Sequence, residues 1–280
     1  MNFNEQYEIY KSQIDAALDG YLRPDGFPFD GLLESMRYSL LSGGKRVRPI
    51  LTLAFAQAVA GMVEEAMPAA CALEMLHTYS LIHDDLPCMD DDDLRRGKPT
   101  NHKVFGECSA VLAGDALQAE AFNTLLGGAL PPERALFCAR YLAAAAGTDG
   151  ICGGQYMDMA ADGMELDDDF LFDLINRKTG ALFVAACAMG VAAAGGTGEQ
   201  EEAACRYGAV LGIAFQIRDD LLDAKEENRG KRTLYKALGK EKCERFIEDM
   251  TKLAKDIVSE HFAGFEFLRA IAETLAKREN

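Results

Sequence analysis

The sequence predicts an all-α protein built as one domain over residues 1–280, and three observations carry this prediction. Ala, Leu, Glu and Met dominate long segments in which apolar residues recur at intervals of three and four, the spacing of one helix face. The alternating Val, Ile and Thr runs that are typical of strands are missing. Hydrophobic types make up 49% of the 280 residues, and no Pro-, Ser- or Gly-rich linker divides the chain, so one sizeable core is expected.

The expected helices begin at residues that favour helix starts. Pro131 and Pro132 precede one helix, Asp167 can start another, and Thr197 with Gln200 resembles a capping box. In chain order, helices are predicted over residues 3–19, 31–41, 47–60, 63–86, 108–126, 133–146, 169–194, 199–223 and 240–262, with a short last helix near the C-terminus.

Charge and cysteine usage narrow the function classes. The chain has 29 Lys and Arg against 45 Asp and Glu, so its net charge of −16 repels nucleic acid and anionic membrane surfaces. A bound anion therefore needs locally concentrated cations. Eight single cysteines without a CxxC pair indicate buried, reduced thiols of a cytoplasmic protein.

Two segments bear on export and membrane insertion. The N-terminal segment carries Glu5, Glu8 and Asp15 where a signal peptide needs a basic stretch followed by an apolar run. Residues 179–198 carry no charge, and the stretch is long enough for a membrane span. Ala and Gly dominate it, whereas insertion is driven by Leu, Ile, Phe and Val. The sequence therefore predicts no integral membrane segment, and close helix packing at 179–198.

The first acidic cluster places six aspartates within the ten residues from Asp84 to Asp93. These carboxylates repel one another unless cations neutralise them, and their hard oxygens suit Mg²⁺, which shares its coordination with phosphate oxygens. Pro87 is expected to end the preceding helix here. Arg95 and Arg96 follow, and arginine binds phosphate with a fixed fork of donors. The cluster indicates a metal and diphosphate site, with a solvated acidic loop as the alternative.

A second acidic motif ends the helix predicted over 199–223. Asp219 and Asp223 are four residues apart and share a helix face, and Gln216 lies one turn before Asp219 and Asp220. Like charges at that spacing destabilise a helix. Metal binding is therefore favoured, and an exposed acidic helix end is the alternative.

Cations gather before the helix predicted at 47–60. Lys45, Arg46 and Arg48 follow Gly43 and Gly44, and glycines allow close backbone approach. Cations at a helix N-terminus oppose its dipole, and a bound anion would relieve that conflict. The stretch predicts a phosphate site, with a flexible basic turn as the alternative.

Two more polar groups lie on predicted helices. Glu74 and His77 precede Asp84 on one helix with roughly aligned faces, so His77 is a candidate hydrogen-bond donor to diphosphate rather than a structural histidine. Lys178 and Thr179 stand beside the uncharged stretch, where Lys178 either faces a cavity or extends its ammonium to solvent.

Together these motifs resemble the trans-isoprenyl diphosphate synthases over nearly the whole chain. Asp84-Asp85-Leu86-Pro87-Cys88-Met89-Asp90 looks like the family's first Asp-rich motif, and Asp219-Asp220-Leu221-Leu222-Asp223 looks like the second. The stretch Gly153-Gly154-Gln155, weak by itself, agrees as well. The resemblance is closest to bacterial farnesyl diphosphate synthases, and it implies an all-α bundle of the isoprenoid synthase type around a deep apolar cavity.

The resemblance assigns a role to each candidate residue. The ligands of Mg²⁺ would be Asp84, Asp85, Asp90, Asp219, Asp220 and Asp223. The allylic diphosphate site would be lined by Arg95, Lys178, Thr179 and Gln216, of which Lys178, Thr179 and Gln216 would act in catalysis by stabilising positive charge. The diphosphate of isopentenyl diphosphate would be bound by Lys45, Arg48, His77 and Arg96.

The implied reaction is the Mg²⁺-dependent head-to-tail condensation of isopentenyl diphosphate with dimethylallyl or geranyl diphosphate. Departure of the allylic diphosphate leaves a cation, the double bond of isopentenyl diphosphate attacks it, and proton loss completes the new bond. In the family, the residues just before the first Asp motif form the floor of the tail pocket. Tyr79 and Ser80 stand there, so the expected product is farnesyl diphosphate, with fifteen carbons. The resemblance also implies a homodimer.

The family's longer loop after the second motif, with its lysine, is shortened after Asp223, where Lys225 or Lys231 are the candidates to replace that lysine. A geranyl or geranylgeranyl diphosphate synthase is the close alternative. A terpene cyclase is less favoured because it needs no isopentenyl site. A catalytically weak partner subunit is supported only by the shortened loop.

Overall fold

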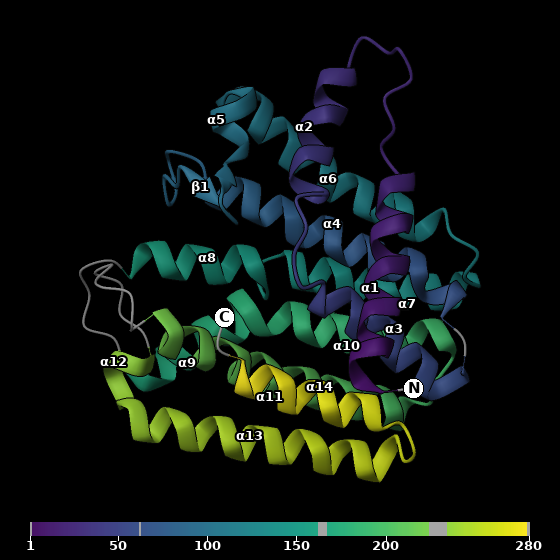
Figure 1. Ribbon diagram of the computed structural model, residues 1–280, viewed down its shortest axis with the longest axis vertical. Coiled ribbons are helices and arrows are strands. Elements are labelled where there is room, and N and C mark those ends of the chain that lie inside the picture. Colours follow the sequence, from purple (N-terminus) through teal and green to yellow (C-terminus); the bar gives the residue numbers. More distant parts are fainter. Residues whose placement is uncertain (1, 62, 162–166, 224–233, 279–280) are drawn as a thin grey trace.

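The computed structural model describes residues 2–61, 63–161, 167–223 and 234–278, apart from the side chain of Asp223, and it confirms the all-α prediction (Figure 1). Lys225 and Lys231 lie outside the described residues. In order, the elements are α1 (Phe3–Gly20), α2 (Asp30–Leu40), α3 (Val47–Ala60), η1 (Glu64–Ala66), α4 (Met67–Asp84), β1 (Leu94–Arg95), β2 (Lys98–Pro99), α5 (Asn101–Phe105), α6 (Glu107–Leu126), α7 (Pro132–Ala146), α8 (Ile151–Ala160), α9 (Asp168–Ile175), η2 (Asn176–Gly180), α10 (Ala181–Ala194), α11 (Gly198–Asp223), α12 (Leu234–Leu238), α13 (Lys240–His261) and α14 (Glu266–Lys277).

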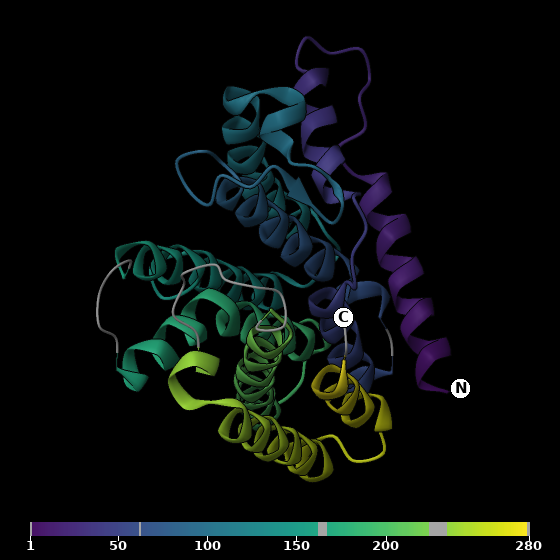
Figure 2. The same cartoon turned by 60° about the vertical axis from the view of Figure 1, so that its left-hand side comes forward.

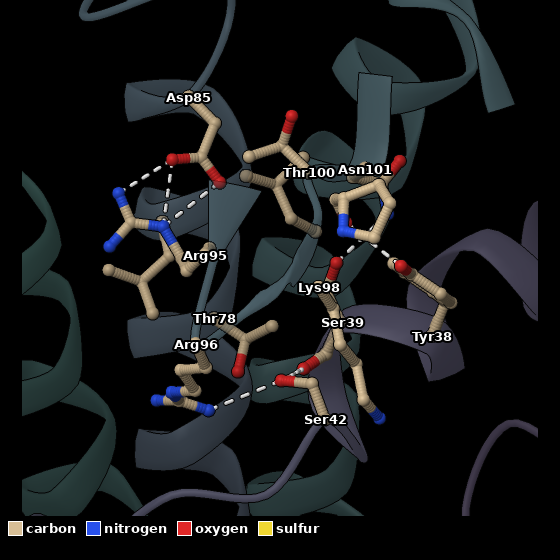
Figure 3. A pocket seen from close by; sticks show the side chains of 13 residues that line it. Tyr38, Ser39, Ser42, Thr78, Asp85, Arg95, Arg96, Lys98, Thr100 and Asn101 are labelled. Atoms are coloured by element: carbon tan, nitrogen blue, oxygen red, sulfur yellow. Dashed lines mark hydrogen bonds and ion pairs between the residues drawn. The ribbon is translucent and has the colours of Figure 1, made fainter. Parts of the chain in front are cut away.

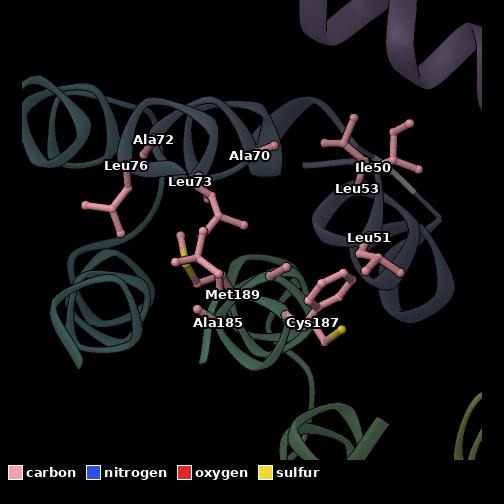
Figure 4. Packing of buried hydrophobic residues seen from close by; sticks show 14 of the residues in the cluster. Ile50, Leu51, Leu53, Ala70, Ala72, Leu73, Leu76, Ala185, Cys187 and Met189 are labelled. Atoms are coloured by element: carbon pink, nitrogen blue, oxygen red, sulfur yellow. The ribbon is translucent and has the colours of Figure 1, made fainter. Parts of the chain in front are cut away.

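The main core forms around α10, whose side chains are almost all buried against α3, α4, α7 and α11 (Figure 4). Small residues allow this approach. A Cβ on Gly190 would lie 2.4 Å from the carbonyl oxygen of Thr52, and a Cβ on Gly208 would lie 2.6 Å from that of Phe183. The close packing predicted for residues 179–198 is therefore confirmed.

Within the described residues, one helical stretch, Asp168–Ala194, is long and apolar enough to cross a membrane. Of its most apolar window, 72% is buried inside the protein. A core helix is buried in this way, because its apolar side chains face neighbouring helices. The rejection of a membrane span at 179–198 agrees with this burial.

Capping hydrogen bonds confirm two predicted helix starts. The N–H of Gln200 donates to Thr197 Oγ1 over 3.2 Å, and the N–H of Thr197 donates to Gln200 Oε1 over 3.0 Å. Asp167 Oδ1 accepts from the N–H of Phe170 over 2.8 Å. Both sets satisfy N–H groups that have no partner inside the helix.

The structure corrects two predicted helices and adds elements that sequence patterns missed. The helix expected at 169–194 is interrupted by the π-helical turn η2, and the helix expected at 63–86 begins with the 3-10 turn η1. The elements missed are the antiparallel pair β1–β2 and the helices α5, α8 and α12. They are two to ten residues long, too short to show a clear helical or strand period.

The cysteines are free thiols, as predicted, but they are not all buried. Cys71, Cys138, Cys187 and Cys243 are buried, whereas Cys88, Cys108 and Cys152 are exposed. Cys88 lies in the turn that follows α4, Cys108 in α6 and Cys152 in α8. The prediction of uniformly buried thiols is therefore wrong.

The two Asp motifs lie at corresponding ends of two long helices. The first follows the C-terminus of α4, and the second ends α11. Figures 1 and 2 show α2, α5 and the β1–β2 hairpin at one end of the molecule, with α13 and α14 at the other. A second, smaller apolar cluster joins α9, α11, α12 and α13, and it supports the end of α11.

Candidate active site

The first Asp motif folds back on the end of α4. The N–H of Asp90 donates to the carbonyl oxygen of Asp84 over 2.9 Å. Burial raises the pKa of Asp84 to about 6, the Lys178 cation opposes this rise, and the Asp90 carboxylate adds to it. The structure therefore brings two predicted metal ligands and one predicted diphosphate ligand together.

Asp85 lies next to Asp84 but has a different environment. The Nε–H of Arg95 donates to its two oxygens over 2.7 and 2.9 Å, and Nη2 of Arg95 lies 2.6 Å from Oδ1 (Figure 3). Burial raises the pKa of Asp85, and hydrogen bonding to Arg95 opposes the rise. Asp85 is thus engaged in orienting Arg95, and its role as a metal ligand stays a prediction.

The hairpin carries Arg96 onto the loop before α3. Arg96 Nη1 donates to Ser42 Oγ over 3.2 Å and to the carbonyl oxygen of Gly43 (Figure 3). Gly44 has a φ of +129°, and a Cβ there would lie 2.9 Å from Arg96 Cζ. A side chain at Gly44 would displace this guanidinium and would be strained at this φ, which gives the predicted close approach a specific cause.

Four predicted ligands of isopentenyl diphosphate are close enough to interact by charge. Arg48 and Arg96 act on His77, and the charges of Asp219 and Arg278 act on both Lys45 and Arg48. Nη1 of Arg48 lies 3.5 Å from Nε2 of His77. Burial lowers the pKa of Arg48 to about 10. Burial, followed by the Arg48 and Arg96 charges, lowers the pKa of His77 well below its usual value. His77 is therefore neutral at pH 7 and offers a hydrogen bond, while the charge comes from the Lys and Arg side chains.

Sequence patterns missed Arg278, a cation at the second Asp motif. Its guanidinium forms an ion pair with Asp219 and lies 3.6 Å from the ring centroid of Phe215. Nη2 also donates to the carbonyl oxygen of Phe215 over 2.9 Å. Burial and then the Arg278 charge lower the pKa of Lys45. Arg278 thus joins the cation group, and no motif marks it because one basic residue at a chain end forms no pattern.

A chain of hydrogen bonds joins Thr179, Gln216 and Asp220. Thr179 Oγ1 donates to Gln216 Oε1 over 2.8 Å, and Gln216 Nε2 donates to Asp220 Oδ1 over 3.0 Å. Asp220 Oδ2 accepts the N–H of Leu234 over 3.1 Å. The predicted one-turn relation between Gln216 and Asp220 is confirmed, while the side chain of Asp223 lies outside the described structure.

Lys178 lies in the π-helical turn η2, a kind of turn that is frequent at functional sites. Its Nζ lies 2.6 Å from Oδ2 of Asp158 on α8, so the side chain is held inside the site rather than extended to solvent. Gly154 allows this contact, because a Cβ there would lie 2.4 Å from the backbone nitrogen of Lys178. The neighbouring Gln155 is buried, and neither amide atom has a hydrogen-bond partner in the described structure.

Tyr79 and Ser80 lie one turn before the end of α4. Tyr79 is 5% exposed, its hydroxyl lies 3.5 Å from Cys152 Sγ on α8, and its ring meets His83 edge-on at 5.7 Å. Ser80 Oγ instead donates to the carbonyl oxygen of His77 over 2.9 Å, within its own helix. Of the two predicted chain-length residues, Tyr79 is thus the one that reaches across to another helix.

A small pocket lies between α2, α4 and the β1–β2 hairpin (Figure 3). The pair of Asp85 and Arg95 lines one side of it, and Arg96 with Ser42 lines another. This small pocket beside the Asp85 and Arg95 pair is not the deep apolar cavity that the family resemblance implies. That cavity stays a prediction.

In the part of the chain that the structure describes, no three Asp, Glu, His or Cys side chains converge closely enough to hold a metal ion by themselves. Mg²⁺ commonly takes one or two carboxylates and completes its shell with waters and substrate phosphates. Asp84 with Asp90, and separately Asp219, offer such oxygens beside cations that suit a diphosphate. The residues fit Mg²⁺ that is bound together with a diphosphate.

The chain is similar to known proteins of one family. A sequence profile described as polyprenyl synthetase matches residues 30–244. The chloroplastic large subunit 1 of a heterodimeric geranylgeranyl pyrophosphate synthase from Arabidopsis thaliana is 43% identical over 271 residues, covering 88% of this chain and 72% of that protein. Geranylgeranyl pyrophosphate synthase 11 of the same plant, also chloroplastic, is 44% identical over 270 residues, covering 88% and 74%.

Solved structures agree as well. An FPP/GFPP synthase from Zymomonas mobilis superposes with a TM-score of 0.91 at 38% identity, covering 98% of this chain and 99% of that one. A geranyltransferase from Legionella pneumophila has a TM-score of 0.91 at 32% identity, covering 99% and 97%. The protein therefore belongs to the polyprenyl synthetase family, with the all-α isoprenoid synthase fold, and is a prenyltransferase that makes prenyl diphosphates.

Proposed function

We propose that this protein catalyses the Mg²⁺-dependent condensation of isopentenyl diphosphate with dimethylallyl or geranyl diphosphate to give farnesyl diphosphate. One observation carries the proposal. Two helix ends each present a carboxylate beside its own cations, Asp84 beside Lys178 and Asp219 beside Lys45 and Arg48. A reaction between two diphosphate esters needs two such places.

The α4 end with Lys178 is the proposed allylic side. Asp84 and Asp90 would hold Mg²⁺ there, and the bound ion would neutralise diphosphate charge and so make it a better leaving group. Arg95 and Lys178 add donors whose interaction strengthens as charge develops on the departing oxygen. Asp85 fixes Arg95 in place by its two-oxygen contact.

The start of α3, together with His77 on α4, is the proposed site for isopentenyl diphosphate. Lys45, Arg48 and Arg96 would neutralise its diphosphate, and neutral His77, whose Nε2 accepts from Arg48, would donate from Nδ1. The diphosphate contacts proposed here are cations and an imidazole of the chain, and the Asp219 carboxylate lies beside two of these cations. Asp219 and Asp220, with Asp223, would hold Mg²⁺ at the boundary between the two sides.

Catalysis also requires that positive charge on the allylic carbons be stabilised and that water be excluded. The hydrogen bonds from Thr179 through Gln216 orient the side-chain oxygens of these two residues before the reaction. Dipoles that are already oriented can stabilise developing charge without reorganising. The ion pair with Asp158 holds Lys178 in the turn η2, so the backbone carbonyl of Lys178 stays beside Thr179. The departing diphosphate is the proposed base for the final proton loss.

Tyr79 supports the product length of fifteen carbons. Its buried ring spans from α4 to Cys152 on α8, so a tail that grows past it would collide with the ring. The proposed product is therefore farnesyl diphosphate. Geranylgeranyl diphosphate is the second candidate, because the two Arabidopsis relatives named above are geranylgeranyl pyrophosphate synthases.

We also propose that two copies of this chain associate through α5, α6 and α7 and that the enzyme is cytoplasmic. Val104 on α5, Val111 and Leu112 on α6, and Leu136 and Phe137 on α7 are large apolar side chains that are exposed in the single chain. These helices are neighbours, and large apolar side chains exposed on neighbouring helices are typical of a subunit interface. Sedimentation equilibrium of the purified protein tests the dimer.

The experiment for the proposed function is an incubation with Mg²⁺, labelled isopentenyl diphosphate and geranyl diphosphate, followed by chain-length analysis of the dephosphorylated alcohols. A fifteen-carbon product that disappears with EDTA is expected. A mainly twenty-carbon product would favour the second candidate. Absence of any condensation by folded protein that binds both diphosphates would contradict the proposal and favour a non-catalytic partner subunit.

A further inference from the structure

Arg46 lies between two proposed ligands of isopentenyl diphosphate, Lys45 and Arg48, but it turns away from them into the protein. It is 4% exposed and adopts a left-handed backbone with a φ of 51° directly before α3. Its three guanidinium nitrogens all have partners. Nη1 donates to Glu74 Oε1 over 2.6 Å, Nη2 to the carbonyl oxygen of Leu40 over 2.8 Å, and Nε to Asp15 Oδ1 over 2.8 Å.

Glu74, the buried partner of Arg46, is 3% exposed and lies on α4 one turn before His77. Through these contacts Arg46 ties the N-terminus of α3 to α4, to the end of α2 and to α1. The loop that carries Lys45 and the helix that carries His77 are therefore fixed to each other by one guanidinium.

Stability does not account for this arrangement. Burial of an ion pair is seldom a net gain, because removing both charges from water costs about as much as their attraction returns. A cation at the N-terminus of α3 also opposes the helix dipole, and a left-handed backbone is costly for a residue with a Cβ. What the pair does fix is the direction in which the chain enters α3. The left-handed backbone of Arg46 turns the chain, and the hydrogen bond from Arg46 Nη1 to Glu74 holds that turn against α4.

Rigid placement matters most for this part of the site. Lys45, Arg48 and His77 come from two separate elements and must meet one diphosphate together, and small displacements of binding groups cause large losses. Arg96 approaches the same loop at Ser42 and Gly43, so a shift of the loop would move that contact also.

We propose that Arg46 and Glu74 are positioning residues for the diphosphate of isopentenyl diphosphate, an inference that rests on the proposed function of this site. They touch no substrate. Their buried pair sets the relative position of the α3 N-terminus and α4, and so the spacing between Lys45, Arg48 and His77.

The test replaces the pair by apolar residues, Arg46→Met with Glu74→Leu, because such replacements of buried ion pairs commonly keep or increase stability. The matched control is Arg37→Met with Asp19→Leu, which removes an ion pair of 2.6 Å between α2 and α1 away from the site. Binding of isopentenyl diphosphate without Mg²⁺ is measured by calorimetry, and KM is measured for each substrate.

We expect the Arg46/Glu74 double variant to bind isopentenyl diphosphate at least about tenfold more weakly and to raise its KM by a similar factor, with the KM for geranyl diphosphate nearly unchanged. The control variant keeps both values. Wild-type affinity for isopentenyl diphosphate in the double variant, or an equal rise in both KM values, would overturn the proposal.

Arg46→Lys is the second variant, in case the double replacement prevents folding. Lysine keeps the charge but cannot reach three partners with a planar fork, so it should show the same selective loss. An unchanged isopentenyl diphosphate affinity in Arg46→Lys would also overturn the proposal. A wild-type protein that binds isopentenyl diphosphate but does not condense it would contradict the proposed function alone, since the binding comparison still decides the positioning role.

Discussion

Asp219 forms an ion pair with Arg278, and the same guanidinium lies 3.6 Å from the centroid of the Phe215 ring. The first residue of the second Asp motif thus has a protein cation as its partner. A divalent cation that binds Asp219 must compete with Arg278 for the carboxylate. The C-terminal segment is in this way connected electrostatically to the proposed metal site.

Replacing this cation should make metal binding easier. We expect Arg278→Gln to lower the Mg²⁺ concentration that gives half-maximal binding of inorganic diphosphate by about threefold to tenfold, because it removes both a competitor and a nearby positive charge. The measurement is a Mg²⁺ titration by calorimetry at fixed diphosphate. Arg269→Gln, which removes a half-exposed cation of α14, should leave the titration unchanged. A higher Mg²⁺ requirement in Arg278→Gln would contradict the competition.

The raised pKa of Asp84 predicts a pH-dependent stability. Its folded value of about 6 lies above the ordinary 3.8, so its protonated form is favoured by folding. This contribution is fully present below about pH 4 and is lost as the pH rises through 6. The free energy of unfolding of wild type relative to Asp84→Asn should therefore fall by on the order of 2 kcal/mol between pH 4 and pH 7 in metal-free buffer.

Urea unfolding at several pH values measures this difference. Asp115→Asn, at an exposed carboxylate of α6, serves as the control and should show no such trend. At pH 7 the Asp84→Asn protein should be more stable than wild type and yet nearly inactive. A wild-type advantage that grows with pH would contradict the assigned environment of Asp84.

Gly154 tests the contact between α8 and the π-helical turn. A Cβ at Gly154 would lie 2.4 Å from the backbone nitrogen of Lys178, so Gly154→Ala must push the turn away from α8. We expect turnover to fall at least about tenfold, because Lys178 and Thr179 move with the turn. Gly31→Ala, where a Cβ meets nothing within 4 Å, is the matched control and should keep wild-type turnover. Equal activity of the two variants would show that the contact has no role.

Tyr79 tests the chain-length argument. Tyr79→Ala should shift the products toward twenty or more carbons under extended incubation, at a stability cost on the order of 3 kcal/mol for the lost buried ring. Tyr156→Ala removes an exposed ring from α8 and should leave the product distribution unchanged. An unchanged product length in the Tyr79 variant, with activity retained, would mean that another residue stops the growing tail.

The sequence predicted those features that depend on local spacing. Apolar intervals of three and four identify the long helices, and the one-turn separation of Gln216 and Asp220 follows directly from helix geometry. The capping pair of Thr197 and Gln200 is also local. The two Asp motifs and the Gly-Gly-Lys-Arg stretch could be found because each is continuous in sequence.

Long-range partners could not be found in this way. Arg278 with Asp219, Arg46 with Glu74, and Lys178 with Asp158 are joined only by the packing of separate helices. Arg46 was expected to contribute to the basic turn, whereas the structure turns it inward. The engagement of Asp85 by Arg95 depends on a hairpin whose strands are two residues each, too short to leave a pattern.

The most direct test of the whole account measures condensation rates of isopentenyl and geranyl diphosphate at saturating Mg²⁺ for wild type, Asp84→Asn and Asp219→Asn. The account predicts Mg²⁺-dependent turnover in wild type and a loss of about a hundredfold or more in each variant, because each removes a carboxylate from one of the two proposed metal positions. Wild-type turnover in either variant would contradict the assignment of both helix ends to one metal-dependent site.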